Sequence, residues 1–349
     1  MNRSQRAAVA GLILFAIGFV VWLLGGSAPR PDIAGDGLPT ATTAPTTTAV
    51  AATGFTGVVV QPDDGRGPIL AEIAAAEHSV DLLVYLLSDD EVIDALIAAV
   101  DRGVEVRVML EEHPFGGNGS NPDTFDRLEA AGARVRWGNP AFRFSHVKMF
   151  VVDDAVAIIM NQNLSRSAFT DNREFAAVTT RQDMVAEAAA IFDADWDRTA
   201  EPDPGPLVVS PIDSRSTLLG LIDGAARSLD LYAEVIRDEE VLVAIERAEA
   251  RGVAVRLLVS PEYGDDDRGT DERTRLAAAG VEIRFTRGLY VHAKAILIDG
   301  SVAWIGSQNF TATSLDDNRE VGIVLDDPAN VGRIRGIFEL DFARGRDAA

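Results

Sequence analysis

The chain has 349 residues, of which 32 are Lys or Arg and 54 are Asp or Glu, so its formal net charge is −22 at pH 7. This field repels a nucleic-acid backbone unless a local basic patch overcomes it. With 47% hydrophobic residues the chain can build two ordinary domains, and the lack of cysteine excludes disulfides, Cys-ligated zinc and thiol nucleophiles.

The N-terminal region is typical of a membrane anchor. Residues 7–28 carry no charged side chain, and their apolar core AAVAGLILFAIGFVVWLL would span about 27 Å as a helix, nearly the thickness of a bilayer core. Arg3 and Arg6 precede this segment, so the positive-inside rule predicts that residues 1–6 are cytoplasmic and the rest extracytoplasmic. The alternative is a cleaved signal peptide, which would release a secreted protein.

Residues 29–53 are predicted to be a linker. They are rich in Pro, Thr, Ala and Gly and have almost no large apolar side chains, so they bury too little surface to order themselves. Nearly all the acidic residues lie beyond this linker. Any contact of the following domains with an anionic bilayer must therefore be local.

The remainder of the chain is an internal duplication. Residues 79–110 align without a gap on residues 228–259, at an offset of 149. A period of this size indicates duplicated domains, not a solenoid of short repeats. We therefore predict one domain over residues 54–200 and a second over residues 207–349, joined by the Pro-rich segment EPDPGP.

Strands and helices alternate within each copy. In the first, the apolar strand 80–87 leads to an amphipathic helix, the strand 104–110 follows, and a second helix at 125–132 precedes the short strand 134–137. This order predicts a sheet with helices on both faces. The segment 292–307 of the second copy reads as two strands joined at a tight Asp-Gly turn, so the predicted sheet is mixed.

The two lysines of the chain are the strongest functional signal. Lys148 and Lys294 each lie two residues after a histidine, His146 and His292 respectively, at matching places in the two copies. Side chains alternate between the faces of a strand, so each histidine points the same way as its lysine. A buried strand face has no structural use for a lysine, which favours a functional site.

Further polar residues recur at matching places. Asn163 and Asn309 follow the second strand of each predicted hairpin, and Glu174 and Glu320 end the two copies of the segment DNRE. Two aspartates, Asp153 and Asp299, lie at the hairpin turns, where we expect a structural role.

These motifs strongly resemble the phospholipase D superfamily, whose repeated His-x-Lys signature occurs here twice. The second copy fits at every motif position: His292, Lys294, Asp299, Gly306, Ser307 and Asn309. The resemblance covers about residues 55–345. It implies an α/β protein with two tandem phospholipase D-like domains, each a mixed β-sheet flanked by helices, related by a pseudo-twofold axis.

The residues themselves support phosphodiester chemistry. One neutral histidine can attack phosphorus while a second, protonated histidine supplies a proton to the leaving oxygen. The lysines and the asparagine amides can hold the phosphoryl oxygens, so no metal or other cofactor is required. Glu174 and Glu320 would each hydrogen-bond a histidine ring nitrogen and fix its tautomer.

The resemblance implies a phosphohistidine intermediate, with His146 as nucleophile and His292 as general acid; the reverse assignment stays open. The first copy departs from the pattern, because Met160 and Asn161 stand where Gly and Ser would be. Asn161 could replace the serine as a hydrogen-bonding group, and Met160 could fill space.

The leading functional hypothesis is a membrane-anchored phospholipase D-like enzyme that hydrolyses glycerophospholipid headgroups to phosphatidic acid. The alternative is phosphatidyl transfer to an alcohol, as in cardiolipin synthases of this family. A nuclease is disfavoured by the acidic charge. A phosphate-binding protein without turnover is disfavoured because both sets of His, Lys, Asn and Glu residues are retained.

Overall fold

The computed structural model describes residues 55–115, 120–261 and 269–348. The predicted anchor at 7–28 and the predicted linker at 29–53 lie outside these residues. None of the helices within the described ranges is long and apolar enough to cross a membrane. We call residues 55–200 half one and residues 207–348 half two.

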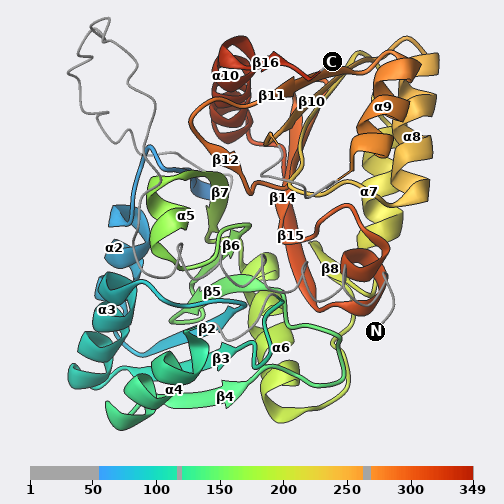
Figure 1. Cartoon of the computed structure of the whole chain (residues 1–349). Helices are drawn as coiled ribbons and strands as arrows, with labels where there is room; N and C mark the ends of the chain where they lie inside the picture. Colours follow the sequence, from blue (N-terminus) through green and yellow to red (C-terminus); the bar gives the residue numbers. More distant parts are fainter. Residues whose placement is uncertain (1–54, 116–119, 262–268, 349) are drawn as a thin grey trace, which may run out of the picture. The chain divides into compact units, whose positions relative to one another are not determined.

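Half one contains a mixed sheet in the order β1-β7-β6-β5-β2-β3-β4 (Figure 1). Its strands are β1 (Phe55–Gln61), β2 (Ser79–Val84), β3 (Glu105–Leu110), β4 (Arg134–Trp137), β5 (Lys148–Val152), β6 (Val156–Met160) and β7 (Asn172–Thr179). Its helices are α2 (Gly67–Ala75), α3 (Asp90–Asp101), α4 (Asn121–Ala130), α5 (Arg166–Thr170) and α6 (Gln182–Asp197). β2, β3 and β4 are parallel, and β2, β5, β6, β7 and β1 pair antiparallel.

Half two repeats this order as β8-β15-β14-β13-β9-β10-β11, with β16 added at the edge beside β11. Its strands are β8 (Leu207–Ser210), β9 (Ser228–Tyr232), β10 (Ala254–Val259), β11 (Glu282–Phe285), β12 (Tyr290–Val291), β13 (Ala295–Ile298), β14 (Val302–Gly306), β15 (Glu320–Leu325) and β16 (Arg346–Asp347). Its helices are α7 (Ser214–Asp223), α8 (Glu239–Ala250), α9 (Thr270–Ala279), a π-helical turn (Thr313–Asp317) and α10 (Pro328–Arg344). The predicted pair of mixed sheets flanked by helices is confirmed.

Local sequence explains why the elements begin and end where they do. The side chain of Asp89 caps α3 by accepting from the Val92 N–H, and Asp238 caps α8 in the same way. Helix α4 starts four residues earlier than the predicted 125–132, because Pro122 suits the first helical turn. The predicted hairpin turn at Asp299 is confirmed, with a φ of 54° at that residue.

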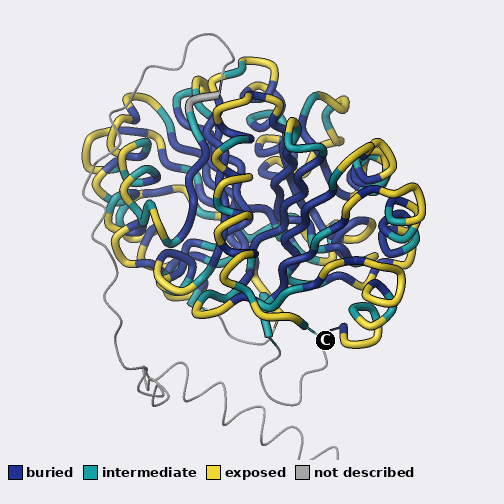
Figure 2. The backbone as a smooth tube through the Cα atoms, turned by 90° about the horizontal axis from the view of Figure 1, so that it is seen from above, coloured by how far each residue is buried: buried dark blue, intermediate teal, exposed yellow. Residues whose placement is uncertain are grey.

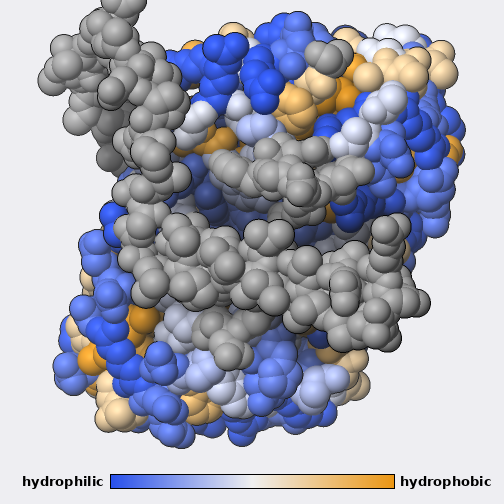
Figure 3. Space-filling model, in the orientation of Figure 1, coloured by the Kyte–Doolittle hydropathy of each residue, from blue (hydrophilic) through white to orange (hydrophobic). Residues whose placement is uncertain are grey.

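The two halves share a core. One buried apolar cluster lies within half one and another within half two, and the third joins residues of β5, β6, β7 and α6 to residues of β13, β14, β15 and α10. Figure 2 shows the buried residues concentrated in the central strands, with exposed positions mostly on the peripheral helices and turns. The surface over α3 and α4 is mainly hydrophilic in Figure 3, with scattered apolar side chains.

Candidate active site

A short backbone exchange between the halves brings the two His-x-Lys segments together. Strand β12, just before His292, pairs in parallel with the start of β7. Reciprocally, Ser145 forms a parallel bridge with Arg319, and the His146 N–H donates to the Arg319 carbonyl at 2.9 Å. Each His-x-Lys segment therefore lies beside the DNRE segment of the other half.

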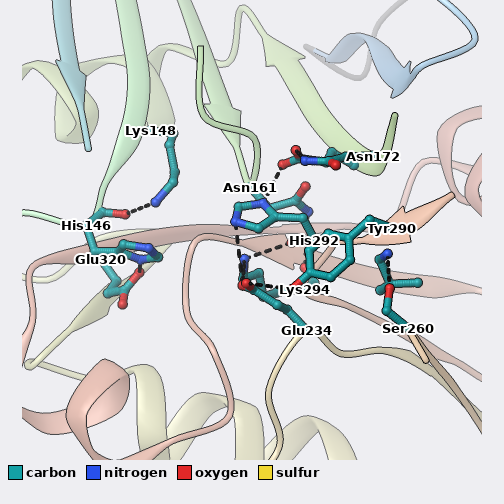
Figure 4. Close-up of polar contacts among 12 residues, drawn as sticks. His146, Lys148, Asn161, Asn172, Glu234, Ser260, Tyr290, His292, Lys294 and Glu320 are labelled. Atoms are coloured by element: carbon teal, nitrogen blue, oxygen red, sulfur yellow. Dashed lines mark hydrogen bonds and ion pairs between the residues drawn. The ribbon is translucent and has the colours of Figure 1, made fainter. Parts of the chain in front are cut away.

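Each histidine is held by a glutamate from the opposite half, and Figure 4 shows Glu320 beside His146. His146 Nδ1 lies 2.7 Å from Glu320 Oε2, and His292 Nδ1 lies 2.8 Å from Glu174 Oε2. Both glutamates are fully buried. A carboxylate at Nδ1 accepts a hydrogen bond and so keeps the ring proton on that nitrogen, which leaves the lone pair of each neutral ring at Nε2.

The asparagines of the two DNRE segments hold the second carboxylate oxygens. The Asn172 amide donates to Glu174 Oε1 at 2.8 Å, and the Asn318 amide donates to Glu320 Oε1 at 3.0 Å. Neither asparagine was singled out from the sequence. The signal was present, since the exact repetition of DNRE includes both.

The two lysines point into the same region from the starts of the hairpins. Lys148 Nζ donates to the His146 carbonyl at 2.7 Å, and Lys294 Nζ donates to the His292 carbonyl at 2.8 Å. Both side chains are almost completely buried, and burial lowers the pKa of Lys148 to about 7. Buried ammonium groups with few partners are suited to bind an anion.

Burial also sets the protonation of the first histidine. It lowers the pKa of His146 to about 4, the Lys148 charge acts in the same direction, and the Glu320 carboxylate opposes both. His146 is therefore neutral at pH 7, as an attacking nitrogen must be.

The structure adds a site residue that sequence reasoning missed. Glu234 Oε2 lies 2.6 Å from Lys294 Nζ and 3.5 Å from His292 Nε2, as the close-up in Figure 4 shows. Burial raises the pKa of Glu234, but the charges of His292 and Lys294 outweigh this and lower it well below its usual range. The repeat alignment pairs Glu234 with Tyr85, so the available signal was a difference between the copies.

Asn163 and Asn309 have free acceptor atoms. The Oδ1 atom of each is buried without a hydrogen-bond partner. The residue that follows each asparagine donates its backbone N–H to a segment just after a strand of the same half. The Leu164 N–H donates to the Leu86 carbonyl, and the Phe310 N–H donates to the Val235 carbonyl. These asparagines thus lie beside the segments that carry Tyr85 and Glu234, with polar atoms left for a ligand.

The two turn aspartates bind backbone. Asp153 accepts from the N–H groups of residues 77, 78 and 79, and Asp299 accepts from those of residues 226, 227 and 228. Each carboxylate ties its hairpin turn to the start of the neighbouring strand. Both turns lie at the end of the hairpin strand that is away from Lys148 and Lys294.

Asn161 occupies the place of Ser307. Asn161 Oδ1 accepts from the Phe175 N–H at 2.8 Å, and Ser307 Oγ accepts from the matching Val321 N–H at 3.1 Å. The Asn161 amide also donates to the Lys294 carbonyl at 3.3 Å. The departure of half one from the motif therefore preserves a hydrogen bond next to the glutamate and adds one between the halves.

Packing explains the glycine that half one lacks. A Cβ on Gly306 would lie 2.5 Å from Trp304 and 2.8 Å from the Cα of Gly322. Half one has Ile158, Met160 and Ala176 at the matching positions of its strands, all of them buried. Half two thus has the large side chain at Trp304 beside a glycine at 306, whereas half one has the smaller Ile158 beside the larger Met160.

Among the described residues, no group of three or more His, Asp and Glu side chains is placed to hold a metal ion.

Comparisons with known proteins agree with this geometry. The family model described as cardiolipin synthase, PLD-like domain, matches residues 69–196 and 218–342. The chain belongs to this family of the phospholipase D superfamily. Cardiolipin synthase A of Citrobacter koseri is 23% identical over 83% of this chain and 69% of its own length, and that of Erwinia tasmaniensis is 25% identical over the same shares.

Solved structures share the fold. Phosphatidylserine synthase of Haemophilus influenzae superposes with a TM-score of 0.65 at 12% identity, covering 86% of this chain and 88% of that one. A polyphosphate kinase from Porphyromonas gingivalis gives a TM-score of 0.64 at 17% identity, covering 83% and 50%.

Proposed function

We propose that this protein is a phosphatidyl transferase that moves the phosphatidyl group of a phospholipid onto an alcohol through a phosphohistidine intermediate. The observation that carries the proposal is the pair of histidines, each held at Nδ1 by a buried glutamate of the other half. Both Nε2 atoms are then available for the reaction. The site requires both halves, as the duplicated motif implies.

The first step forms the covalent intermediate. Nε2 of neutral His146 attacks phosphorus, the P–O bond to the headgroup alcohol breaks, and His292 gives its Nε2 proton to the departing oxygen. Lys148 and Lys294, together with the Asn163 and Asn309 amides, hold the phosphoryl oxygens as charge shifts. Catalytic roles are thereby proposed for eight residues: His146, Lys148, Asn163, Glu174, His292, Lys294, Asn309 and Glu320.

The second step regenerates the enzyme. An acceptor hydroxyl gives its proton to His292, its oxygen attacks phosphorus, and the P–N bond to His146 breaks. Glu174 and Glu320 keep the two rings oriented through both steps. Water in place of the alcohol would give hydrolysis to phosphatidic acid, which is the leading hypothesis from the sequence.

The comparisons favour transfer over that hydrolysis. The relatives at 23% and 25% identity are cardiolipin synthases, and the matched family carries that description too. We therefore place phosphatidyl transfer first and hydrolysis second. The anchor proposed at residues 7–28 would hold the two halves at a lipid surface, on the extracytoplasmic side.

The test is a lipid-product assay on the full chain. The protein is incubated with mixed phospholipid vesicles and ethanol, and products are identified by mass spectrometry beside His146→Ala. Phosphatidylethanol or cardiolipin in excess of phosphatidic acid, from the parent chain alone, is the expected result. An excess of phosphatidic acid would restore hydrolysis as the main activity. No lipid product from a folded protein would refute both.

A further inference from the structure

The two halves of the site are duplicated in almost every contact. Each has a histidine with a glutamate at Nδ1, a lysine that donates to the histidine carbonyl, and an asparagine that holds the glutamate. A chemically symmetric site would give neither histidine a preferred role. The reaction nevertheless needs one neutral and one protonated ring at its start.

The symmetry fails at several positions, among them Asn161 against Ser307 and Glu111 against Ser260, and at one further position the residue that faces the histidine ring itself differs. In half one, Tyr85 packs edge-on against His146 with ring centroids 4.5 Å apart, and its ring also lies 4.9 Å from Lys148 Nζ. In half two, the matching residue is Glu234, which contacts Lys294 Nζ at 2.6 Å and His292 Nε2 at 3.5 Å. Where half one has the neutral aromatic ring of Tyr85, half two thus has the carboxylate of Glu234.

The difference between Tyr85 and Glu234 changes the charge around the two histidine rings. Among the described residues, Lys148 has no carboxylate within ion-pair distance; burial and the Lys148 charge lower the pKa of His146, and the Glu320 carboxylate only partly offsets them. Lys294 is compensated by Glu234, whose Oε2 atom also faces the proton-carrying nitrogen of His292. The His146 ring thus has a buried ammonium beside it that no carboxylate pairs with, whereas a carboxylate faces Nε2 of the His292 ring.

We propose that Glu234 makes the two halves chemically unequal, holding His292 as the proton donor and leaving His146 as the nucleophile. The inference rests on the proposed function and deepens it. Glu234 is a positioning residue, since it acts through His292. The charged and titratable groups that face His292 are Glu174 on β7, Glu234 after β9, Tyr290 on β12, Lys294 before β13, and His146 with Lys148 across the site.

The direct test locates the covalent intermediate. The full chain is mixed with dibutyryl phosphatidylglycerol, quenched in denaturant and digested with trypsin. His146 and His292 then lie in different peptides, residues 144–148 and 288–294, because Arg143, Lys148, Arg287 and Lys294 are cleavage sites. The adduct in the parent chain is expected on the peptide of His146.

Swapping the unequal residues should move the adduct. Glu234→Tyr gives half two the residue of half one, so we expect the adduct to be shared between both peptides. In the double variant Tyr85→Glu with Glu234→Tyr, the larger share is expected on the peptide of His292. Glu240→Gln, which changes an exposed carboxylate on α8, is the control and should leave the adduct on the peptide of His146.

A second measurement needs no turnover. Glu234→Gln keeps the side-chain shape and removes its charge, so the NMR titration of His292 should move to lower pH while that of His146 moves less. The four histidines are assigned by single His→Gln variants. If the protein is active, the alkaline limb of kcat/KM should move in the same direction.

An adduct on the peptide of His292 in the parent chain would overturn the inference, and so would titrations that Glu234→Gln leaves in place. An adduct that stays on the peptide of His146 in the double variant would also overturn it. If no substrate gives product or adduct, the proposed function fails instead, and the titrations still decide whether Glu234 controls the proton on His292.

Discussion

His146 Nδ1 and Glu320 Oε2 lie 2.7 Å apart, although 174 residues separate them in the chain. The reciprocal pair, His292 and Glu174, is equally close at 2.8 Å. Each half therefore supplies one histidine and receives from the other half the carboxylate that orients its ring. The carboxylate at Nδ1 of each of these two histidines therefore comes from the other half.

The first prediction concerns these glutamates. Glu320→Gln keeps the size of the side chain, but its amide can present an N–H group to His146 and so favour the wrong tautomer. We expect kcat for phosphatidyl transfer to fall about 100-fold with little change in the far-UV circular dichroism spectrum. Glu174→Gln should lower kcat in the same way, through its effect on His292. Glu129→Gln, on the exposed face of α4, is the control, and an equal loss there would contradict the orienting role.

The sequence predicted much of the site because its motifs are duplicated. The His-x-Lys segments, the hairpins and the DNRE segments occur twice, and the structure brings both histidines, both lysines and both glutamates into one region. The exchange of glutamates between halves was not predictable. It depends on the pairing of β12 with β7, which is set by how the two sheets pack.

Residues that differ between the copies could not be predicted from the repetition of the motifs. Glu234 does not recur in the first copy, because Tyr85 stands at the matching position of the repeat. The chemical signal is the difference between these two residues. Asn161 departs from the motif, but it makes the hydrogen bond of Ser307, as expected of a residue that replaces the serine as a hydrogen-bonding group. The closing helices α6 and α10 were not predicted, although both fill the shared core.

The second prediction concerns the proton on Lys148. Burial lowers the pKa of this lysine to about 7, so at pH 8 the free protein holds it mostly neutral. A bound oxyanion stabilises the ammonium form and raises that pKa, so binding takes up close to one proton at pH 8 and almost none at pH 5.5. The measurement is calorimetric titration with tungstate in two buffers of different ionisation enthalpy.

Lys148→Arg supplies the control for this experiment. A guanidinium stays charged at every pH of the titration, so the uptake at pH 8 should disappear even where the oxyanion still binds. Uptake that persists in the variant would assign the proton to another group.

The third prediction concerns the stability that Asn161 provides. Asn161→Ala leaves the buried N–H of Phe175 without its acceptor, and we expect the free energy of unfolding to fall by about 1–3 kcal/mol. Asn161→Ser introduces the side chain that half two uses and should cost less. Urea unfolding of both variants measures the difference, and equal losses would mean that the hydrogen bond to Phe175 is not what Asn161 provides.

The last prediction concerns the buried ion pair beside the site. Arg319 of half two is 1% exposed and contacts Asp195 of α6 in half one at 2.8 Å. Arg173 of half one contacts Asp341 of α10 in half two in the same way, so each half is linked to the last helix of the other. Asp195→Ala leaves the guanidinium with Glu201 alone, and the expected loss of unfolding free energy is about 3–5 kcal/mol. Removing both partners, as Arg319→Met with Asp195→Ala, should cost less than the sum of the single changes.

An exposed ion pair provides the comparison. Arg134 and Glu105 are 2.7 Å apart, with side chains 56% and 54% exposed. Water solvates either group when its partner is removed, so Glu105→Ala should change the unfolding free energy by only about 0–1 kcal/mol. If Asp195→Ala cost no more than Glu105→Ala in urea unfolding, the pair between Arg319 and α6 would not be holding the halves together. The crossed histidine–glutamate geometry would then depend on the shared apolar core, the strand pairing and the other contacts between the halves, such as that of Arg173 with Asp341.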